Sequence, residues 1–171
     1  TDNMNISGES FDYGPWRFLP AWDMQFTAAY FDQTGLYAFG RQSEAVQWNL
    51  VQLAHALRIA APAESLVPAL RTWPEALAAH LRAQAMWRLG LQRGEAGQEE
   101  ALIRAFEAGM AQSGIQPDRA WFLFRGGQAP KDSAAGFETF TTLLRDFRPA
   151  SGARDHPYWA GPGPETMLID E

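Results

Sequence analysis

Residues 43–57 read SEAVQWNLVQLAHAL, and this stretch indicates the fold class of the whole chain. Ser43 is a good N-cap residue, and apolar residues follow at a spacing that places them on one face of a helix. These residues are Val46, Leu50, Leu53 and Leu57. The pattern predicts a helix from about Ser43 to Ala60. Trp48 and Val51 lie off the stripe, so we expect this helix to be buried on two sides.

The helical period continues through most of the remaining sequence. Further helices are predicted over residues 64–71, 72–89, 98–113 and 117–125, and from Asp132 or Ser133 to just before Pro149. Thr72 and Glu75 form a capping box with Pro74 in the first turn, so a new helix is expected to start at Thr72. Glycines mark the ends of two helices, at Gly114 and at Gly126-Gly127.

These helices predict an all-α protein. A chain of 171 residues with 46% hydrophobic residues can bury one sizeable core, so residues 1–171 are expected to form a single domain. Within it we expect a loop over residues 1–15, an irregular aromatic-rich segment over residues 16–42 and a helical bundle over residues 43–171. The tryptophans interpreted as core residues are Trp48, Trp73, Trp87 and Trp121.

Charge and composition argue against several classes of function. A net charge of −6 and a pI near 5.1 disfavour nucleic-acid binding, which requires a basic surface. The absence of cysteine excludes disulfides and thiolate metal sites, and the three histidines lack ligand spacing. No apolar run approaches the roughly 20 residues of a membrane span, and no signal peptide opens the chain. We therefore expect a cytoplasmic, bacterial-type protein with no nucleic-acid and no membrane partner.

The chemistry is expected in residues 1–15, which read TDNMNISGESFDYGP. Asp2 and Asn3 stand a short polar loop upstream of Asp12-Tyr13-Gly14. Kinase-type sites use this arrangement to hold a divalent metal on the phosphates of a nucleotide. An Asn amide oxygen and an Asp carboxylate ligate the metal, and a further Asp takes the proton from the attacking hydroxyl. A few hard oxygen ligands suit Mg²⁺, with Mn²⁺ as the alternative.

Neighbouring side chains in an extended loop point to opposite sides. We therefore interpret Asn3 as a metal ligand and Asp2 as the catalytic base. Asp12 is interpreted as the second metal ligand and as the residue that holds the nucleotide phosphates, because Gly14 permits a tight backbone and Pro15 stiffens the chain after it. An isolated Asp-Asn pair would more simply form an Asx turn or a helix N-cap.

Two groups of short motifs carry a family resemblance. The first group is Thr1–Met4, Ile6–Glu9 and Asp12–Pro15, and the second is Gly35–Gly40, Gln42 and Trp48–Leu50, with Leu53, Ala54 and Leu57. Together they resemble the selenoprotein O family, called YdiU in bacteria, whose kinase-like members transfer AMP from ATP to protein hydroxyls. Asn5, Leu36 and Ser43 depart from the residues usual in that family, but none of these changes removes a metal ligand.

The resemblance implies the helical C-terminal lobe of a kinase-like fold and a protein adenylyltransferase that acts on Ser, Thr or Tyr hydroxyls. It also implies ATP as substrate, and it supports Asp2 as the base. Because the chain begins inside the catalytic loop, we expect a segment of a longer protein that is inactive alone. Two other functions stay open, namely a protein or small-molecule kinase using the same metal site and a non-catalytic helical interaction domain.

Overall fold

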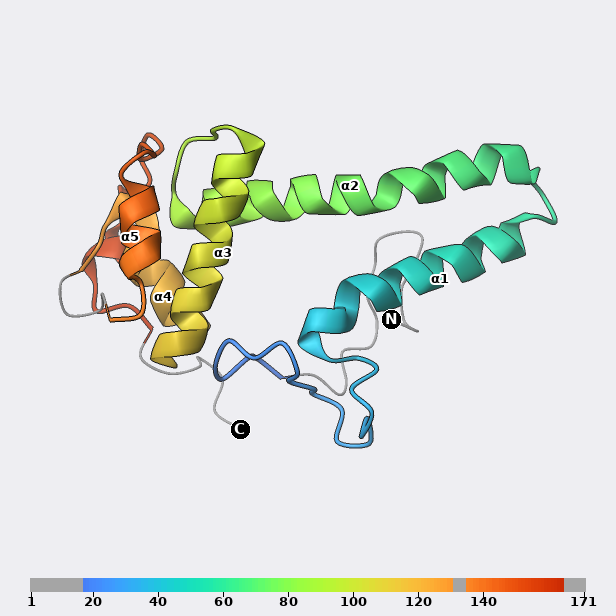
Figure 1. The fold of residues 1–171 in the computed structure, drawn as a ribbon, viewed down its shortest axis with the longest axis horizontal. Helices are drawn as coiled ribbons and strands as arrows, with labels where there is room; N and C mark the ends of the chain where they lie inside the picture. The colour runs from blue at the N-terminus through green and yellow to red at the C-terminus, as the bar shows by residue number, and fades with distance from the viewer. Residues whose placement is uncertain (1–16, 131–134, 165–171) are drawn as a thin grey trace. The chain divides into compact units, whose positions relative to one another are not determined.

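The computed structural model describes residues 17–130 and 135–164, and these residues are helical with irregular connections (Figure 1). The all-α prediction is therefore confirmed. The described residues form two compact units. The first unit contains residues 17–18 and 23–77, and the second contains residues 19–22, 78–130 and 135–164. The expectation of a single domain stays a prediction.

The first unit contains a 3-10 turn, η1 (Phe39–Arg41), the helix α1 (Gln42–Leu57), and the beginning of α2 (Ala63–Leu89). The helix α1 begins where the sequence predicts but ends at Leu57, before the predicted end near Ala60, and its packing also differs from the prediction. No residue of α1 is buried, and Trp48 has 61% of its surface exposed. The prediction that this helix is buried on two sides is wrong, because Trp48 is exposed and Val46, Leu50 and Leu53 are only half-buried.

The helix α2 is continuous where the sequence predicts two helices that meet at Thr72. Pro68 and Pro74 both lie inside it. The ring of proline fixes φ near the helical value, but each proline also removes one helical hydrogen bond and crowds the carbonyl four residues before it. The hydroxyl of Thr72 donates to the carbonyl of Ala69 at 2.8 Å instead of capping a new helix.

The second unit contains the end of α2, then α3 (Ala96–Ser113), α4 (Pro117–Phe124), the 3-10 turn η2 (Arg125–Gly127), α5 (Glu138–Leu144) and the 3-10 turn η4 (Pro157–Ala160). The predicted ends are confirmed: Gly114 has φ 67° and donates its N–H to the carbonyl of Met110, and Gly126 has φ 72°. Such left-handed conformations favour glycine. The side chain of Gln116 caps α4 by accepting the N–H of Arg119 at 2.7 Å.

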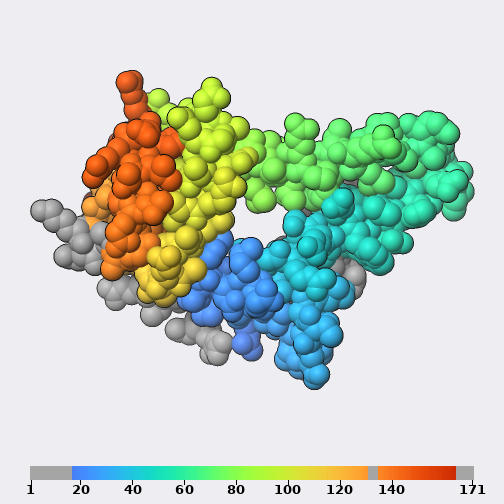
Figure 2. Space-filling view, viewed as in Figure 1, coloured from blue at the N-terminus to red at the C-terminus, as the bar shows by residue number. Residues whose placement is uncertain are grey.

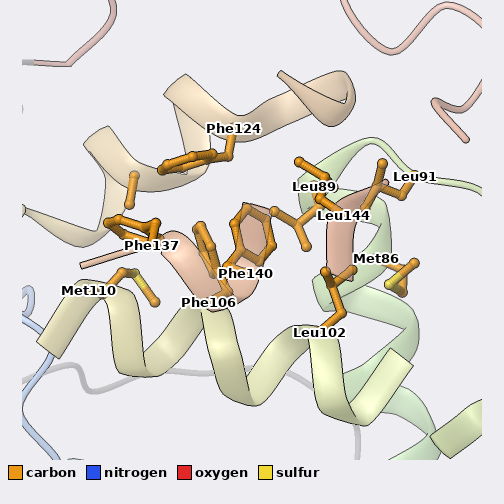
Figure 3. Packing of buried hydrophobic residues seen from close by; sticks show 11 residues of the cluster. Met86, Leu89, Leu91, Leu102, Phe106, Met110, Phe124, Phe137, Phe140 and Leu144 are labelled. Carbon is orange, nitrogen blue, oxygen red and sulfur yellow. The ribbon is translucent and has the colours of Figure 1, made fainter. Parts of the chain in front are cut away.

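The core of the second unit lies between α3 and the segments that pack on it (Figure 3). The helix α3 packs directly against α5, and the yellow and orange atoms of the two helices are adjacent in Figure 2. Phe106 of α3 is fully buried at its centre. The aromatic rings with centroids between 4.6 and 5.7 Å from that of Phe106 belong to Trp121, Phe124, Phe137 and Phe140. Trp22, which belongs to this unit, also packs against the cluster.

Two further predictions need correction. The helix expected from Asp132 or Ser133 begins at Glu138, because Gly136, with φ 86°, forms a turn just before it. Residues 131–134 lie outside the described part of the chain. Trp87, expected in the core, is 67% exposed, and the guanidinium of Arg125 lies 5.7 Å from its ring. None of the helices within residues 17–130 and 135–164 has the length and apolar character needed to cross a membrane.

Candidate functional site: a loop and hollow beside α1

The three residues predicted to carry the chemistry, Asp2, Asn3 and Asp12, lie outside the described residues. The structure does describe the segment after them, from Arg17 into α1. This segment contains the second group of family-like motifs, and the loop and the hollow below belong to the first unit.

A turn centred on Asp32 organises this segment. One carboxylate oxygen of Asp32 accepts the N–H of Leu36 at 2.9 Å, and the other accepts the N–H of Tyr37 at 2.7 Å. Gly35 has φ 66°, which lets the chain reverse beneath the carboxylate. The hydrogen bond from Tyr37 is the main reason that the pKa of Asp32 is lowered from its usual value. The charged Asp32 carboxylate therefore stabilises the turn by binding the backbone N–H groups of Leu36 and Tyr37.

Two backbone hydrogen bonds close the segment on itself. The N–H of Phe39 donates to the carbonyl of Phe26 at 2.9 Å, and the N–H of Gly40 donates to the carbonyl of Met24 at 2.9 Å. A Cβ atom at Gly40 would lie 3.0 Å from Met24, so the close approach of the two stretches of chain favours glycine there. Ala38, next to these bonds, is fully buried.

Next to this loop, the first turns of α1 border a hollow of about 380 Å³. Its lining residues are Leu36, Tyr37, Arg41, Glu44, Ala45, Trp48 and Asn49. Nε of Arg41 lies 3.4 Å from Oε2 of Glu44, and its Nη1 lies 3.4 Å from the carbonyl oxygen of Gly35. The hollow therefore combines apolar and aromatic surface with one charge pair.

The lining of the hollow is mixed, with apolar, aromatic and charged side chains and one amide. In residues 17–130 and 135–164, no group of three or more His, Asp or Glu side chains is placed to hold a metal ion. Trp48, predicted to lie in the core, lines this hollow instead, and the sequence motifs do not point to Arg41 or Glu44. The signal that could have found the hollow is the i, i+3 pairing of these two charges beside an off-stripe tryptophan.

The second unit uses its charged side chains to support the backbone. Arg125 donates from Nε to the carbonyl of Ala153 at 2.7 Å. Its Nη1 donates to two carbonyls in the last turn of α2, those of Trp87 and Arg88, each at 2.9 Å. Arg154 donates in the same way to the carbonyl of Trp159 at 2.6 Å. Burial, and then the nearby charge of Arg154, lower the pKa of Arg125. Both guanidiniums thus satisfy carbonyls at helix ends and in loops.

Comparison with known proteins decides the family. The family model described as "Protein adenylyltransferase SelO" matches residues 1–132, which is most of the chain. The chain belongs to the SelO family. The matched range includes Asp2, Asn3 and Asp12, the hollow beside α1, and α3 and α4 of the second unit.

Curated relatives agree with this assignment. Relatives named "Protein nucleotidyltransferase YdiU" include one from Synechocystis, 48% identical over 73 residues, which are 43% of this chain and 15% of the relative. Another, from Shewanella sp. strain MR-4, is 36% identical over 140 residues, which are 78% of this chain and 28% of the relative. A third, from Vibrio cholerae, is 41% identical over 106 residues, which are 62% of this chain and 22% of the relative. The chain thus spans less than a third of the length of these SelO-family proteins.

Proposed function

We propose that the SelO-family polypeptide containing this segment transfers AMP from ATP to Ser, Thr or Tyr hydroxyls of target proteins. The observation that carries this proposal is the family match over residues 1–132, which includes an intact Asp2, Asn3 and Asp12. The described fold supports this proposal, because the C-terminal lobe of a kinase-like fold is mainly helical, as the described residues are.

The proposed roles rest on the chemistry of the side chains. Asn3 and Asp12 would hold Mg²⁺ or Mn²⁺, because amide and carboxylate oxygens are the hard donors these ions take. When bound, the ion neutralises charge on the phosphates. Asp2 accepts the proton of the target hydroxyl, whose oxygen bonds to the α-phosphorus while the bond from that phosphorus to the bridging oxygen of pyrophosphate breaks. The products are AMP joined to the target and free pyrophosphate.

The same three residues are compatible with attack at the γ-phosphate, which would make the protein a kinase. Phosphoryl and adenylyl transfer both need charge neutralisation and an aligned hydroxyl, so the metal ligands do not separate them. Family membership favours adenylyl transfer. The deciding experiment supplies ATP labelled at either the α- or the γ-phosphate to the polypeptide at the length of its relatives.

Label from the α-position alone on a protein target supports the proposal. Label from the γ-position alone would replace it with a kinase. No transfer of either label by a folded protein, with several candidate target proteins present, would favour a helical interaction domain.

Asp12→Ala tests the metal site in the same polypeptide. Loss of a direct metal ligand is expected to remove several kcal/mol of transition-state stabilisation and so to abolish transfer. Asn3→Ala is expected to be less severe. Asp2→Ala is expected to lower turnover more than ATP affinity, because the base acts on the hydroxyl and not on the nucleotide. Near-normal turnover in Asp12→Ala, with an unchanged circular dichroism spectrum, would remove Asp12 from the mechanism.

The 171-residue chain by itself is expected not to bind Mg-ATP at micromolar concentration. Kinase-like sites also use a glycine-rich loop and a lysine to hold the phosphates. The chain has one lysine, Lys131, far in sequence from the predicted catalytic loop. Calorimetric titration with Mg-ATP measures this directly, and a micromolar dissociation constant would place the whole nucleotide site within these residues.

A further inference from the structure

In the middle of α2, residues 72–75 have the sequence that usually begins a helix, although the helix continues through them. Thr72 and Glu75 have the spacing of a capping box, and Pro74 stands at the second position of the helix that such a box would begin. In a capping box, the Thr hydroxyl accepts the N–H of the Glu, and the Glu carboxylate accepts the N–H of the Thr. In the structure this region is nevertheless continuous α-helix from Ala63 to Leu89 (Figure 1).

The continuous form carries local penalties at this point. Pro74 has no N–H, so the carbonyl of Leu70 lacks its partner in the helical i to i−4 series. Trp73 precedes a proline, and the proline ring disfavours helical conformation in the residue before it. The hydroxyl of Thr72 is held by the carbonyl of Ala69 at 2.8 Å, a back-bond that slightly destabilises helices.

Packing around this point does little to offset those penalties. Thr72, Pro74 and Glu75 are exposed, and Trp73 is only half-buried. The first buried residues of α2 are Ala85 and Met86, about three turns further on. Burial therefore contributes little to holding residues 72–75 in the continuous helix.

We propose that α2 interconverts between the continuous helix 63–89 and a broken form in which a separate helix begins after Thr72. In the broken form the Thr72 hydroxyl leaves the carbonyl of Ala69 and accepts the N–H of Glu75, whose carboxylate accepts the N–H of Thr72. The division between the two compact units falls at Leu77/Ala78, within about one turn of Pro74. Among the described helices, the break thus lies in the one that contributes residues to both units.

The other proline in α2 provides a matched control. For a helix with Pro68 at the same position, the capping residue would be Leu66 and the third residue Ala69, neither of which can cap. Ser65, the nearest hydroxyl upstream, already bonds to the carbonyl of Pro62 at 2.8 Å. Pro68 removes the same kind of hydrogen bond as Pro74 but offers no alternative helix start.

Hydrogen exchange measures the break locally. In the full chain, Pro74→Ala is expected to slow exchange of the amides of residues 70–77 by about tenfold or more, because alanine restores the hydrogen bond and the helix propensity. Pro68→Ala is expected to leave those amides unchanged. Glu75→Ala is expected to slow them as well, whereas Glu75→Gln is expected to match the wild type, because Gln also completes a capping box.

The comparison at residue 75 separates a switch from a merely weak helix. Ala and Gln are both good helix formers, so in a helix without a broken form the two variants would exchange alike. Equal exchange in Glu75→Ala and Glu75→Gln, or no response of residues 70–77 to Pro74→Ala, would overturn the proposal.

Distance measurement gives an independent readout. The chain has no cysteine, so spin labels placed by Glu64→Cys and Gln84→Cys are site-specific, and both positions are exposed. In a continuous helix the two positions are about 30 Å apart along the axis. The wild type is expected to show a second, shorter distance that disappears in Pro74→Ala. A single distance near ~30 Å in the wild type would overturn the proposal, and none of these tests depends on catalytic activity.

Discussion

Each compact unit of this chain contains a helix with an apolar stripe, but only the second unit buries that stripe. In the second unit, α3 buries Leu102, Phe106 and Met110 completely. In the first unit, α1 is nearly as long and also has an apolar stripe, yet none of its residues is buried. Within residues 17–18 and 23–77, Ala38 is the one buried residue.

The difference lies in what covers each stripe. The aromatic side chains of Phe124, Phe137 and Phe140 come from segments after α3 and close over Phe106 (Figure 3). In α1, the stripe residues Val46, Leu50 and Leu53 are only half-buried, and Leu57 is exposed. An apolar stripe thus shows which face of a helix can be buried. Whether that face is buried depends on side chains from other segments that pack against it.

The largest expected difference between the units is in the cost of removing an aromatic ring. Phe106→Ala is expected to lower the free energy of unfolding by about 3 to 5 kcal/mol, because it leaves a cavity at the centre of a ring cluster. Trp48→Ala, in the first unit, is expected to change it by less than about 1 kcal/mol, because most of the indole is already in water.

Urea denaturation followed by far-ultraviolet circular dichroism measures both variants against the wild type. A cost for Trp48→Ala equal to that of Phe106→Ala would mean that the first unit has a core of its own, and the contrast between the units would fail.

A smaller effect is expected from adding one methyl group to α3. A Cβ atom at Gly109 would overlap the ring of Phe137, so Gly109→Ala is expected to destabilise the fold by about 1 to 3 kcal/mol despite its better helix propensity. Gly97, in the same helix, has open space around its Cα, so Gly97→Ala is expected to stabilise the fold by up to about 1 kcal/mol.

Thermal unfolding of the two alanine variants shows the sign of each change. The expected melting temperatures lie on opposite sides of the wild-type value. A rise for Gly109→Ala would show that the ring of Phe137 has room to move and that the core of the second unit is looser than its ring contacts indicate.

The smallest expected effects concern ion pairs. Glu99 is fully buried, and Nε and Nη2 of Arg93 donate to its two carboxylate oxygens at 2.6 and 2.8 Å, while the N–H of Gly94 donates at 2.8 Å. Glu99→Gln is expected to lower the free energy of unfolding by about 1 to 2 kcal/mol, a modest value because half of the Arg93 side chain is exposed and screened. Glu44→Gln, at the exposed pair of the first unit, is expected to change it by less than about 0.5 kcal/mol.

The stability difference between the wild type and Glu99→Gln is expected to depend on pH. Hydrogen bonding from Arg93 is the main reason that the pKa of Glu99 is lowered in the folded protein. The ionised Glu99 carboxylate therefore contributes fully to the free energy of unfolding above the pKa of an unfolded glutamate, about 4.3. This contribution is lost as the pH falls through the lower pKa of the folded protein. The difference between wild type and Glu99→Gln should shrink as the pH falls below about 4. A difference that stays constant from about pH 7 to about pH 3 would contradict the role of the Glu99 charge.

Several features of this chain follow from local sequence. The start of α1, the glycine that ends α3 at Gly114, and the stop at Gly126 were predicted from caps and periodicity. The family was predicted from short motifs and is confirmed. These predictions succeed because capping and left-handed glycine conformations depend on residues within a few positions of each other. The roles of Asp2, Asn3 and Asp12 stay predictions.

Other features were decided by the tertiary structure. The sequence alone determined that the chain is helical, where most helices end and which residues are apolar. The structure also shows that α2 continues past Thr72 and that α5 begins at Glu138. Only the folded chain decided that Phe106 is buried while Trp48 is exposed. The physical reason is that a side chain becomes buried only when residues distant in sequence pack on it. The apolar period of one helix does not show which residues these are.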